Sequence, residues 1–527
     1  MHRALAFTLA LSPLILILVG IIYFRISGAW MAVIGWAYTA ILAWAVFRTD
    51  PIVVLGSSAT GIIKSFGVSV SVVFTMLMIF IMKECGALAT VSDVMKRLGG
   101  GDKENEALMI GIGFGTLLTS LGVVTPAMFP PLLLMMGFTP FASVAIAVLG
   151  YNASTSFALL SIPITLPAEI GGLDASYFAY KVCLYLPVVS TLISFALLWM
   201  VGGRESIRKG FVPALLSGLV LGLSALFFTA FDLVPVAVIG VLSSALTIIS
   251  LYIYQYAGKS SESGSEKRWA GVDWVRVLRA FSPWIILIAL AAITNLSVVR
   301  GTLMSILGSA EVVHVYADVS VDLNVLVQVY TIILLSTLIS IPLMGAGKED
   351  IRRALRVWVR RIPQPFIAYS LYFAIAFIMF SSASIVQNGA VVKPSYFREY
   401  NMDVIIGATL ASIFGAAYIY IAAFLGVFGA VVGGSETSSN VMFLKIQREG
   451  CASIGLSHDQ FMTVFSAHAV GGGIASAITP SKINNAVVTI NESTRMESEV
   501  LKNHLIVVLV ITMIVGIMTA LFIALGL

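Results

Sequence analysis

Long apolar runs dominate this chain and restrict it to one class of fold. Most are close to or above the roughly 20 residues that an α-helix needs to cross the hydrocarbon core of a bilayer. Charged residues make up only 11% of the 527 residues, against about 25% in soluble domains. The sequence therefore predicts an all-α polytopic membrane protein with about 11–14 transmembrane segments. The runs are 4–24, 29–47, 52–82, 178–200, 211–229, 234–256, 281–299, 323–345, 364–386, 403–432 and 504–526.

Three of these runs carry further information. The runs 52–82 and 403–432 exceed the length of one crossing, so each is a candidate for two helices separated by a break. The run 4–24 is too long and too apolar for the core of a signal peptide. It is expected to remain as the first transmembrane helix.

Basic residues gather in the loops 204–209, 257–280 and 348–361, and they predict the orientation of the chain. Two apolar runs separate each neighbouring pair of loops, so all three lie on one side. Basic loops stay in the cytoplasm, which predicts a multi-pass cell-membrane protein with these loops cytoplasmic. The loop 257–280 also reads as a linker between an N-terminal transmembrane half (1–256) and a C-terminal half (281–527). The last loop has helical character and is expected to lie on the membrane surface.

Motifs for cofactors, metals and enzymatic chemistry are missing from the sequence. Cys85, Cys183 and Cys451 lie far apart, and no CxxC, zinc, haem or P-loop spacing occurs. The glycines at 111–115 lie inside an apolar segment and lack the strand and acid of a dinucleotide site. No HExxH or GxSxG motif supports an intramembrane enzyme, and nothing suggests the selectivity filter of a channel. We expect no catalytic residue, cofactor, metal or nucleic-acid partner, and the net charge of +5 is explained by topology.

Polar residues interrupt the apolar sequence most clearly in the region 433–490 of the C-terminal half. The octapeptide Gly433-Gly-Ser-Glu-Thr-Ser-Ser-Asn440 cannot continue a lipid-facing helix, because unsatisfied polar groups are costly in hydrocarbon. A second break is expected at Gly471–Gly473 and Thr479–Asn485. Two breaks of this kind predict two arms of one site for a polar solute.

The region 108–168 of the N-terminal half repeats this arrangement. Hydroxyl residues at 119, 120 and 125 precede Pro126, which is expected to end a helix, and a second polar cluster follows at 152–156. Interruptions in corresponding positions of two halves are typical of secondary transporters built from inverted repeats. Helix N-termini at such breaks can hold an anion. For a single serine, close packing of helices remains the alternative.

Several motifs in these regions match those of a known family. Leu425-Gly-Val-Phe428 leads into Gly434–Phe443 and Gln447, Gly471-Gly472 precedes Ile478-Thr-Pro480, and the N-terminal half contributes Gly113-Phe-Gly115, Gly137-Phe138, Asn152 and Ile162-Pro-Ile164. Together with Ser282-Pro-Trp284 they resemble the L-lactate permease family of membrane carboxylate carriers. The resemblance implies proton symport of lactate, glycolate and related 2-hydroxy monocarboxylates. It also implies a place in the wider ion-transporter superfamily, with inverted repeats, paired hairpins and alternating access.

The sequence departs from the family pattern in the first region. Where the family carries a carboxylate and a Gly-Phe-Gly-Ala-Pro run, this chain has Thr119–Pro126, and Asn152-Ala-Ser-Thr155 replaces an Asn-Thr-Ala-Pro pattern. The chain is therefore identified as a divergent member. A same-fold carrier of another organic anion, such as a dicarboxylate, or one coupled to sodium, stays open.

These patterns together nominate residues for the site. Glu436 and His468 are the candidates for proton coupling, with helix capping and core packing as their respective alternatives. Lys482 is a candidate counter-charge for the substrate, unless it extends to the membrane interface. The expected partners are a small organic anion, a coupling proton or sodium ion and the lipid bilayer, and a homodimer stays open. The candidate substrate-binding residues are Thr119, Ser120, Thr125, Asn152, Ser154, Thr155, Ser435, Thr437, Ser438, Ser439, Asn440, Thr479, Ser481 and Lys482.

Overall fold

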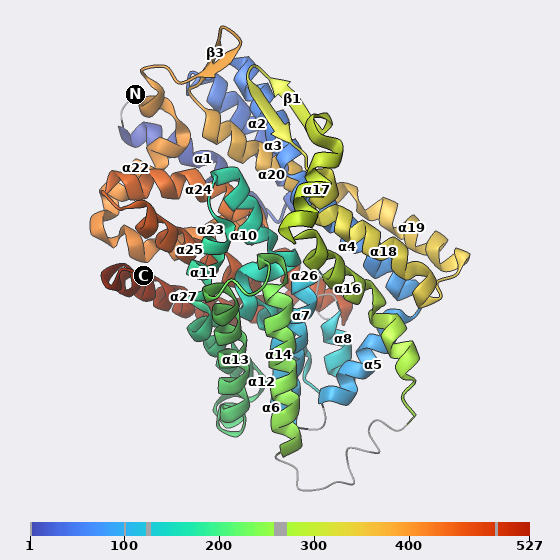
Figure 1. The fold of residues 1–527 in the computed structure, drawn as a ribbon. Coiled ribbons are helices and arrows are strands. Elements are labelled where there is room, and N and C mark those ends of the chain that lie inside the picture. Colours follow the sequence, from blue (N-terminus) through green and yellow to red (C-terminus); the bar gives the residue numbers. More distant parts are fainter. Residues whose placement is uncertain (1–2, 100–101, 123–127, 258–270, 491–493) are drawn as a thin grey trace.

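The computed structural model describes residues 3–99, 102–122, 128–257, 271–490 and 494–527, and these residues are almost entirely helical (Figure 1). They include 12 helices or helix pairs long and apolar enough to cross a membrane. This number falls within the predicted range and confirms a polytopic all-α membrane protein. Of the predicted linker 257–280, residues 274–280 belong to the start of α16, and residues 258–270 are outside the described part.

The N-terminal half contains α1 (Arg3–Ile22), α2 (Gly28–Ala45), α3 (Pro51–Lys64), α4 (Phe66–Glu84), α5 (Ala87–Gly99), α6 (Lys103–Leu108), the π-helix η1 (Met109–Phe114), α7 (Gly115–Ser120), α8 (Phe129–Met135), α9 (Pro140–Leu149), the 3₁₀-helix η3 (Gly150–Phe157), α10 (Ala158–Gly171), α11 (Ala175–Cys183), α12 (Leu186–Lys209), α13 (Phe211–Ala230) and α14 (Val236–Ala257).

The C-terminal half contains α16 (Trp274–Thr294), α17 (Ser297–Leu307), η4 (Gly308–Glu311), β1 (Val312–Tyr316), β2 (Val319–Asp322), η5 (Val325–Val327), α18 (Val329–Met344), α19 (Lys348–Arg361), α20 (Pro363–Ser381), β3 (Ile385–Gln387), β4 (Ala390–Val392), α21 (Phe397–Tyr400), α22 (Met402–Phe414), η6 (Gly415–Ala417), α23 (Tyr418–Gly433), α24 (Glu436–Ser453), α25 (His458–Ile474), η7 (Ala475–Ile478), α26 (Pro480–Thr489) and α27 (Thr494–Leu525).

Both long apolar runs are broken pairs, as their lengths predicted. The run 52–82 divides at Ser65 into α3 and α4. The run 403–432 divides at Gly415, whose φ of 52° is readily adopted only by glycine, into α22 and α23. Excess length over one bilayer crossing is therefore a sound signal for a helix break in this chain.

Two small β-hairpins lie at one end of the molecule, and the hydropathy pattern did not anticipate them (Figure 1). β1 pairs with β2 and β3 pairs with β4, both antiparallel. The backbone N–H of Val391 donates to Asp318 Oδ1 at 2.8 Å, which joins the two hairpins. Within the described residues they are the strand segments of an otherwise helical chain.

Helix α19 is amphipathic and lies on the outside of the helical body, attached to α4 (Figure 1). Ala354 is buried beside Leu77 and Ile81 of α4. The indole N–H of Trp358 donates to the carbonyl oxygen of Val73 at 2.7 Å. Most of the basic side chains of α19 are exposed, as expected for a helix on a membrane surface.

The glycine triplet 471–473 does not break its helix, contrary to the sequence-based expectation. α25 continues through the triplet to Ile474, and the chain leaves helical geometry only at η7 and Thr479. The glycines instead allow close helix packing. A Cβ added to Gly471 would lie 2.1 Å from the carbonyl oxygen of Ala423, and one added to Gly426 would lie 1.9 Å from that of His468.

Replacing Gly426 by alanine is expected to destabilise the protein, because α23 and α25 must separate to admit the methyl group. Overpacking of this kind costs about 1–3 kcal/mol, so the melting temperature in detergent should fall by several degrees. The control is Gly301→Ala on α17, where an added Cβ has no neighbour within 4 Å. Equal melting temperatures for the two variants would contradict the close approach of α23 and α25.

Candidate substrate site

The N-terminal arm of the site consists of η3 and the irregular first turn of α10. Thr155 has a φ of 39°, and Leu159, Leu160 and Ser161 have φ values of 50°, 53° and 64°. Left-handed backbone at consecutive non-glycine residues is strained, and such strain concentrates at functional sites. The polar cluster at 152–156 therefore interrupts the helix within the buried interior.

The C-terminal arm is the turn between α23 and α24, and its sequence explains its shape. Gly434 adopts the left-handed conformation that ends α23, with φ 70°. Ser435 then caps α24, its Oγ accepting a hydrogen bond from the backbone N–H of Ser438. Glu436 is the first residue of α24, where unpaired backbone N–H groups and the helix dipole favour negative charge.

A third segment brings a cation to the same place. The chain unwinds at η7, turns at Thr479 and enters α26 at Pro480. From α26, the Lys482 ammonium group donates to Ser476 Oγ at 2.7 Å and lies 5.8 Å from the centre of the Tyr151 ring. Tyr151 belongs to the N-terminal arm, so Lys482 brings this third segment into contact with that arm.

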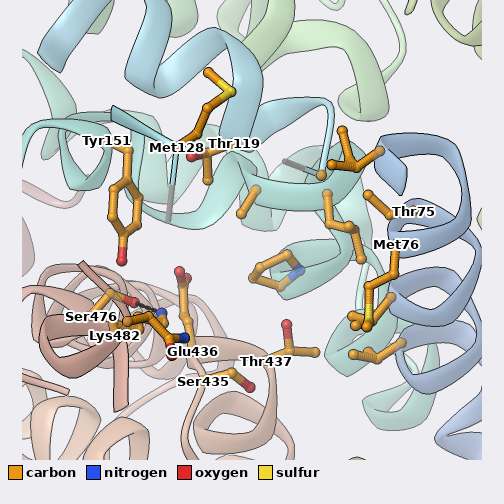
Figure 2. A pocket seen from close by; sticks show the side chains of 18 of the residues that line it. Thr75, Met76, Thr119, Met128, Tyr151, Ser435, Glu436, Thr437, Ser476 and Lys482 are labelled. Carbon is orange, nitrogen blue, oxygen red and sulfur yellow. Dashed lines mark hydrogen bonds between the residues drawn. The ribbon is translucent and has the colours of Figure 1, made fainter. Parts of the chain in front are cut away.

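These segments surround a cavity of about 660 Å³ (Figure 2). Thr119, Asn152 and Thr155 line it from the N-terminal half, and Ser435, Glu436 and Thr437 line it from the C-terminal half. Figure 2 shows Glu436 and Tyr151 directed into the same space, next to Ser476 and Lys482. The two interrupted regions thus meet in one cavity.

Glu436 is enclosed by both arms, with only 6% of its surface exposed. Ser156 and Asn440 are its polar neighbours, and Lys482 is the cation that acts on it electrostatically. Its Oε1 has no hydrogen-bond partner among the described residues, nor does Thr155 Oγ1. A buried carboxyl group and hydroxyl group without partners provide donors and acceptors for a ligand or a proton.

Gly473 explains how Glu436 and Thr155 fit so closely together. A Cβ at this position would lie 2.9 Å from Glu436 Oε2 and 2.8 Å from Thr155 Cβ. The glycine therefore provides the space in which the arms meet.

Comparison with known proteins identifies the family of this chain. The family model described as L-lactate permease matches residues 6–526. The chain belongs to the L-lactate permease family. It is therefore a transport protein of the cell membrane rather than an enzyme.

The similarity between this permease and individual relatives is low. The glycolate permease GlcA of Escherichia coli K12 is 24% identical over 465 residues, which cover 80% of this chain and 78% of the relative. An L-lactate permease of Halalkalibacterium halodurans is 22% identical over 514 residues, covering 93% and 92%. The solved structure of MtrF from Neisseria gonorrhoeae, described as an efflux pump, covers 88% of this chain and 82% of its own at 14% identity. Its TM-score of 0.40 is too low to establish a shared fold. The permease is thus a divergent member, as its departures from the family motifs indicated.

The structure divides the nominated residues of this permease into two groups. Those that line the cavity are Thr119, Asn152, Thr155, Ser435, Glu436, Thr437 and Lys482. Those placed outside its lining are Ser120, Ser154, Ser438, Ser439, Asn440, His468 and Thr479. Thr125 lies outside the described residues, as does the side chain of Ser481.

Asn440 has a role that the sequence could have revealed. Its Nδ2 donates to the carbonyl oxygen of Pro163 at 2.9 Å. In a regular helix this carbonyl would bond to the N–H of residue 167, but residue 167 is proline and has none. Asn440 therefore satisfies a carbonyl that Pro167 leaves free, and it connects α24 to α10.

His468 lies in a complete hydrogen-bond network behind the cavity. Its Nε2 is 3.1 Å from Ser439 Oγ, which is also 3.0 Å from the carbonyl oxygen of Gly426. Its Nδ1 is 3.1 Å from Gln447 Nε2, and Gln447 Oε1 accepts from Tyr418. An imidazole that donates from Nε2 and accepts at Nδ1 satisfies every member, so the network fits neutral histidine. These contacts favour the packing alternative for His468.

Sequence reasoning missed five uncharged polar residues that line the cavity: Thr75, Tyr151, Tyr369, Ser476 and Asn485. Tyr151 precedes Asn152 directly, so its proximity to the polar cluster was a usable signal. Tyr369 lies within α20, an apolar segment without interruption, and nothing in the pattern indicated its role. Two exposed cations, Lys83 and Arg361, also line the cavity.

Thr155 and Ser154 are expected to respond differently to alanine substitution. Thr155 faces the cavity with an unpartnered hydroxyl, whereas Ser154 Oγ donates to the carbonyl oxygen of Tyr151 at 3.3 Å. Loss of a substrate hydrogen bond in Thr155→Ala should weaken apparent affinity by about 1–3 kcal/mol, measured as the half-saturation concentration for lactate uptake. Ser154→Ala is the matched control and should keep the wild-type value. The opposite order would show that Ser154 contacts the substrate.

Proposed function

We propose that this permease is a secondary transporter that carries small 2-hydroxy monocarboxylates, such as lactate and glycolate, together with a proton by alternating access. The observation that carries the proposal is the placement of one carboxyl group, Glu436, and one ammonium group, Lys482, in the same cavity. The names of the relatives, glycolate permease and L-lactate permease, support the substrate class.

The charges of these two groups give a physical reason for proton coupling. With Glu436 ionised and Lys482 protonated, the charges of these two groups cancel in the absence of substrate. Binding an anion alone would leave one uncompensated negative charge in a low-dielectric interior, which is strongly unfavourable. Protonation of Glu436 restores neutrality, so the anion and the proton enter together. Both the empty and the loaded forms are then neutral and able to change conformation.

The arms also offer a binding mode for each end of the substrate. The substrate carboxylate pairs with Lys482, whose ammonium group is held in place by Ser476. The unpartnered Thr155 hydroxyl and the protonated Glu436 are hydrogen-bonding groups for the 2-hydroxyl. A hydroxyl-specific site can discriminate strongly against acids that lack this group, because its own buried polar atoms would stay unpaired.

The alternatives to this proposal are a dicarboxylate substrate and coupling to sodium. A dicarboxylate would require a second cation, and the other described cations that line the cavity, Lys83 and Arg361, are exposed to solvent. This observation favours a monocarboxylate. The missing acid in the first region keeps sodium coupling as the alternative to protons.

Uptake of radiolabelled lactate into proteoliposomes tests the proposal. An inward proton gradient should drive accumulation that collapses with a protonophore, whereas a sodium gradient alone should not. Unlabelled glycolate should compete, and succinate should not. Accumulation driven by sodium, or competition by succinate at similar concentration, would establish the corresponding alternative. No uptake under any gradient would refute monocarboxylate transport.

A further inference from the structure

One wall of the cavity comes from a single face of α4 and is apolar apart from Thr75 and Lys83. Val68, Val72, Met76, Ile79 and Phe80 recur at helical spacing and all line the cavity. All but Val68 keep part of their surface exposed. Leu159, from the unwound N-terminal arm, adds to this apolar wall.

The polar groups lie on the other side of the same space. Figure 2 shows Met76 and Thr75 on one side of the cavity and Tyr151, Ser476 and Lys482 on the other. The hydroxyl of Thr75 donates to the carbonyl oxygen of Ser71 at 2.9 Å, so it is already engaged within α4. The α4 side of the cavity is thus mainly apolar, and the opposite side carries the polar groups.

This arrangement does not match the needs of lactate or glycolate alone. Lactate has a single methyl group, and glycolate has none. A volume of about 660 Å³ lies in the range of pockets that hold drug-sized ligands. Acids this small would bury almost no apolar surface against the wall. An aliphatic chain would bury more, and this burial would add favourable binding free energy.

We propose that the cavity takes 2-hydroxy monocarboxylates with longer aliphatic chains, the carboxylate at Lys482 and the chain against the α4 wall. This inference rests on the proposed function for its carboxylate end. The α4 wall then sets chain-length preference, because each methylene that leaves water for an apolar surface contributes favourable free energy.

Competition with radiolabelled lactate in proteoliposomes tests the inference. The competitors are 2-hydroxybutanoate, 2-hydroxypentanoate and 2-hydroxyhexanoate, at a pH where the acids are ionised, with protein-free vesicles as the control for leakage. Each added methylene should lower the half-inhibitory concentration by about fourfold until the wall is covered. Flat or weakening inhibition along the series, with lactate still taken up, would overturn the inference alone. Absence of lactate uptake would instead refute the proposed function.

Substitutions on the α4 wall test whether the chain-length preference arises there. Val72→Phe and Met76→Phe fill the space for the chain, so the half-inhibitory concentration of 2-hydroxyhexanoate should rise by about tenfold relative to that of unlabelled lactate in the same variant. The matched control is Ile339→Phe on α18, a side chain that is 47% exposed and does not line the cavity. It should leave the chain-length series unchanged. If both wall variants keep the wild-type series, the chain does not contact α4.

Discussion

Glu436→Gln will abolish accumulation of substrate against its gradient while exchange of labelled for unlabelled substrate persists. The amide preserves size and hydrogen bonding but cannot titrate. With the anion bound, the neutral amide and the anion–Lys482 pair form a site without net charge that can change conformation. Without the anion, the site carries the uncompensated charge of Lys482, so the empty carrier cannot return.

Two assays in the same proteoliposomes separate these steps. Net uptake under an inward proton gradient should fall to the background of protein-free vesicles, and counterflow should remain measurable. The control is Glu205→Gln on α12, an acid whose side chain is 74% exposed and which should behave as wild type. Accumulation by the Glu436 variant at wild-type rates would mean that the proton travels through another group, and His468 would be tested next.

Lys482→Met will remove substrate binding. The methionine side chain keeps most of the volume but leaves both the substrate carboxylate and an ionised Glu436 without a cation. Removing one partner of a buried ion pair costs about 3–5 kcal/mol, equivalent to more than about a hundredfold in affinity. Substrate-dependent thermal stabilisation should disappear, and so should exchange, which distinguishes this variant from Glu436→Gln.

Lys83→Met is the matched control for Lys482→Met. Lys83 lines the same cavity but is exposed, so its charge is screened by solvent and salt. Its removal should change apparent affinity only modestly, and the change should shrink as ionic strength rises. Equal losses for the two variants would show that Lys482 does not contact the substrate directly.

The sequence predicted the membrane architecture well because hydrophobicity alone determines it. Segments longer than one crossing had to break, and both did, at Ser65 and Gly415. The Gly434-Ser435-Glu436 turn was also readable, since a left-handed glycine followed by a capping serine and an acid is a local pattern. Features set by neighbours in sequence could be predicted.

Features that depend on residues distant in sequence but close in space could not be predicted. The triplet 471–473 contains helix-weakening residues, but the close contacts with α23 and the arms hold it helical. A histidine in the sequence is compatible with both a proton relay and a packed core. The hydrogen-bond partners Ser439 and Gln447, which only the structure reveals, favour the packed core for His468. The apolar face of α4 looked like an ordinary transmembrane helix, because spacing does not reveal which face meets a cavity.

The attachment of α19 to α4 connects a surface helix to a wall of the cavity. Trp358 and the Arg353–Glu84 ion pair, at 2.8 Å, fasten a surface helix to the helix that forms the cavity wall. If that wall moves between inward and outward states, α19 must move with it and displace the surrounding headgroups. Helices α4 and α19 would then move together as one rigid body. The turnover rate would depend on the viscosity and lateral pressure of the lipid.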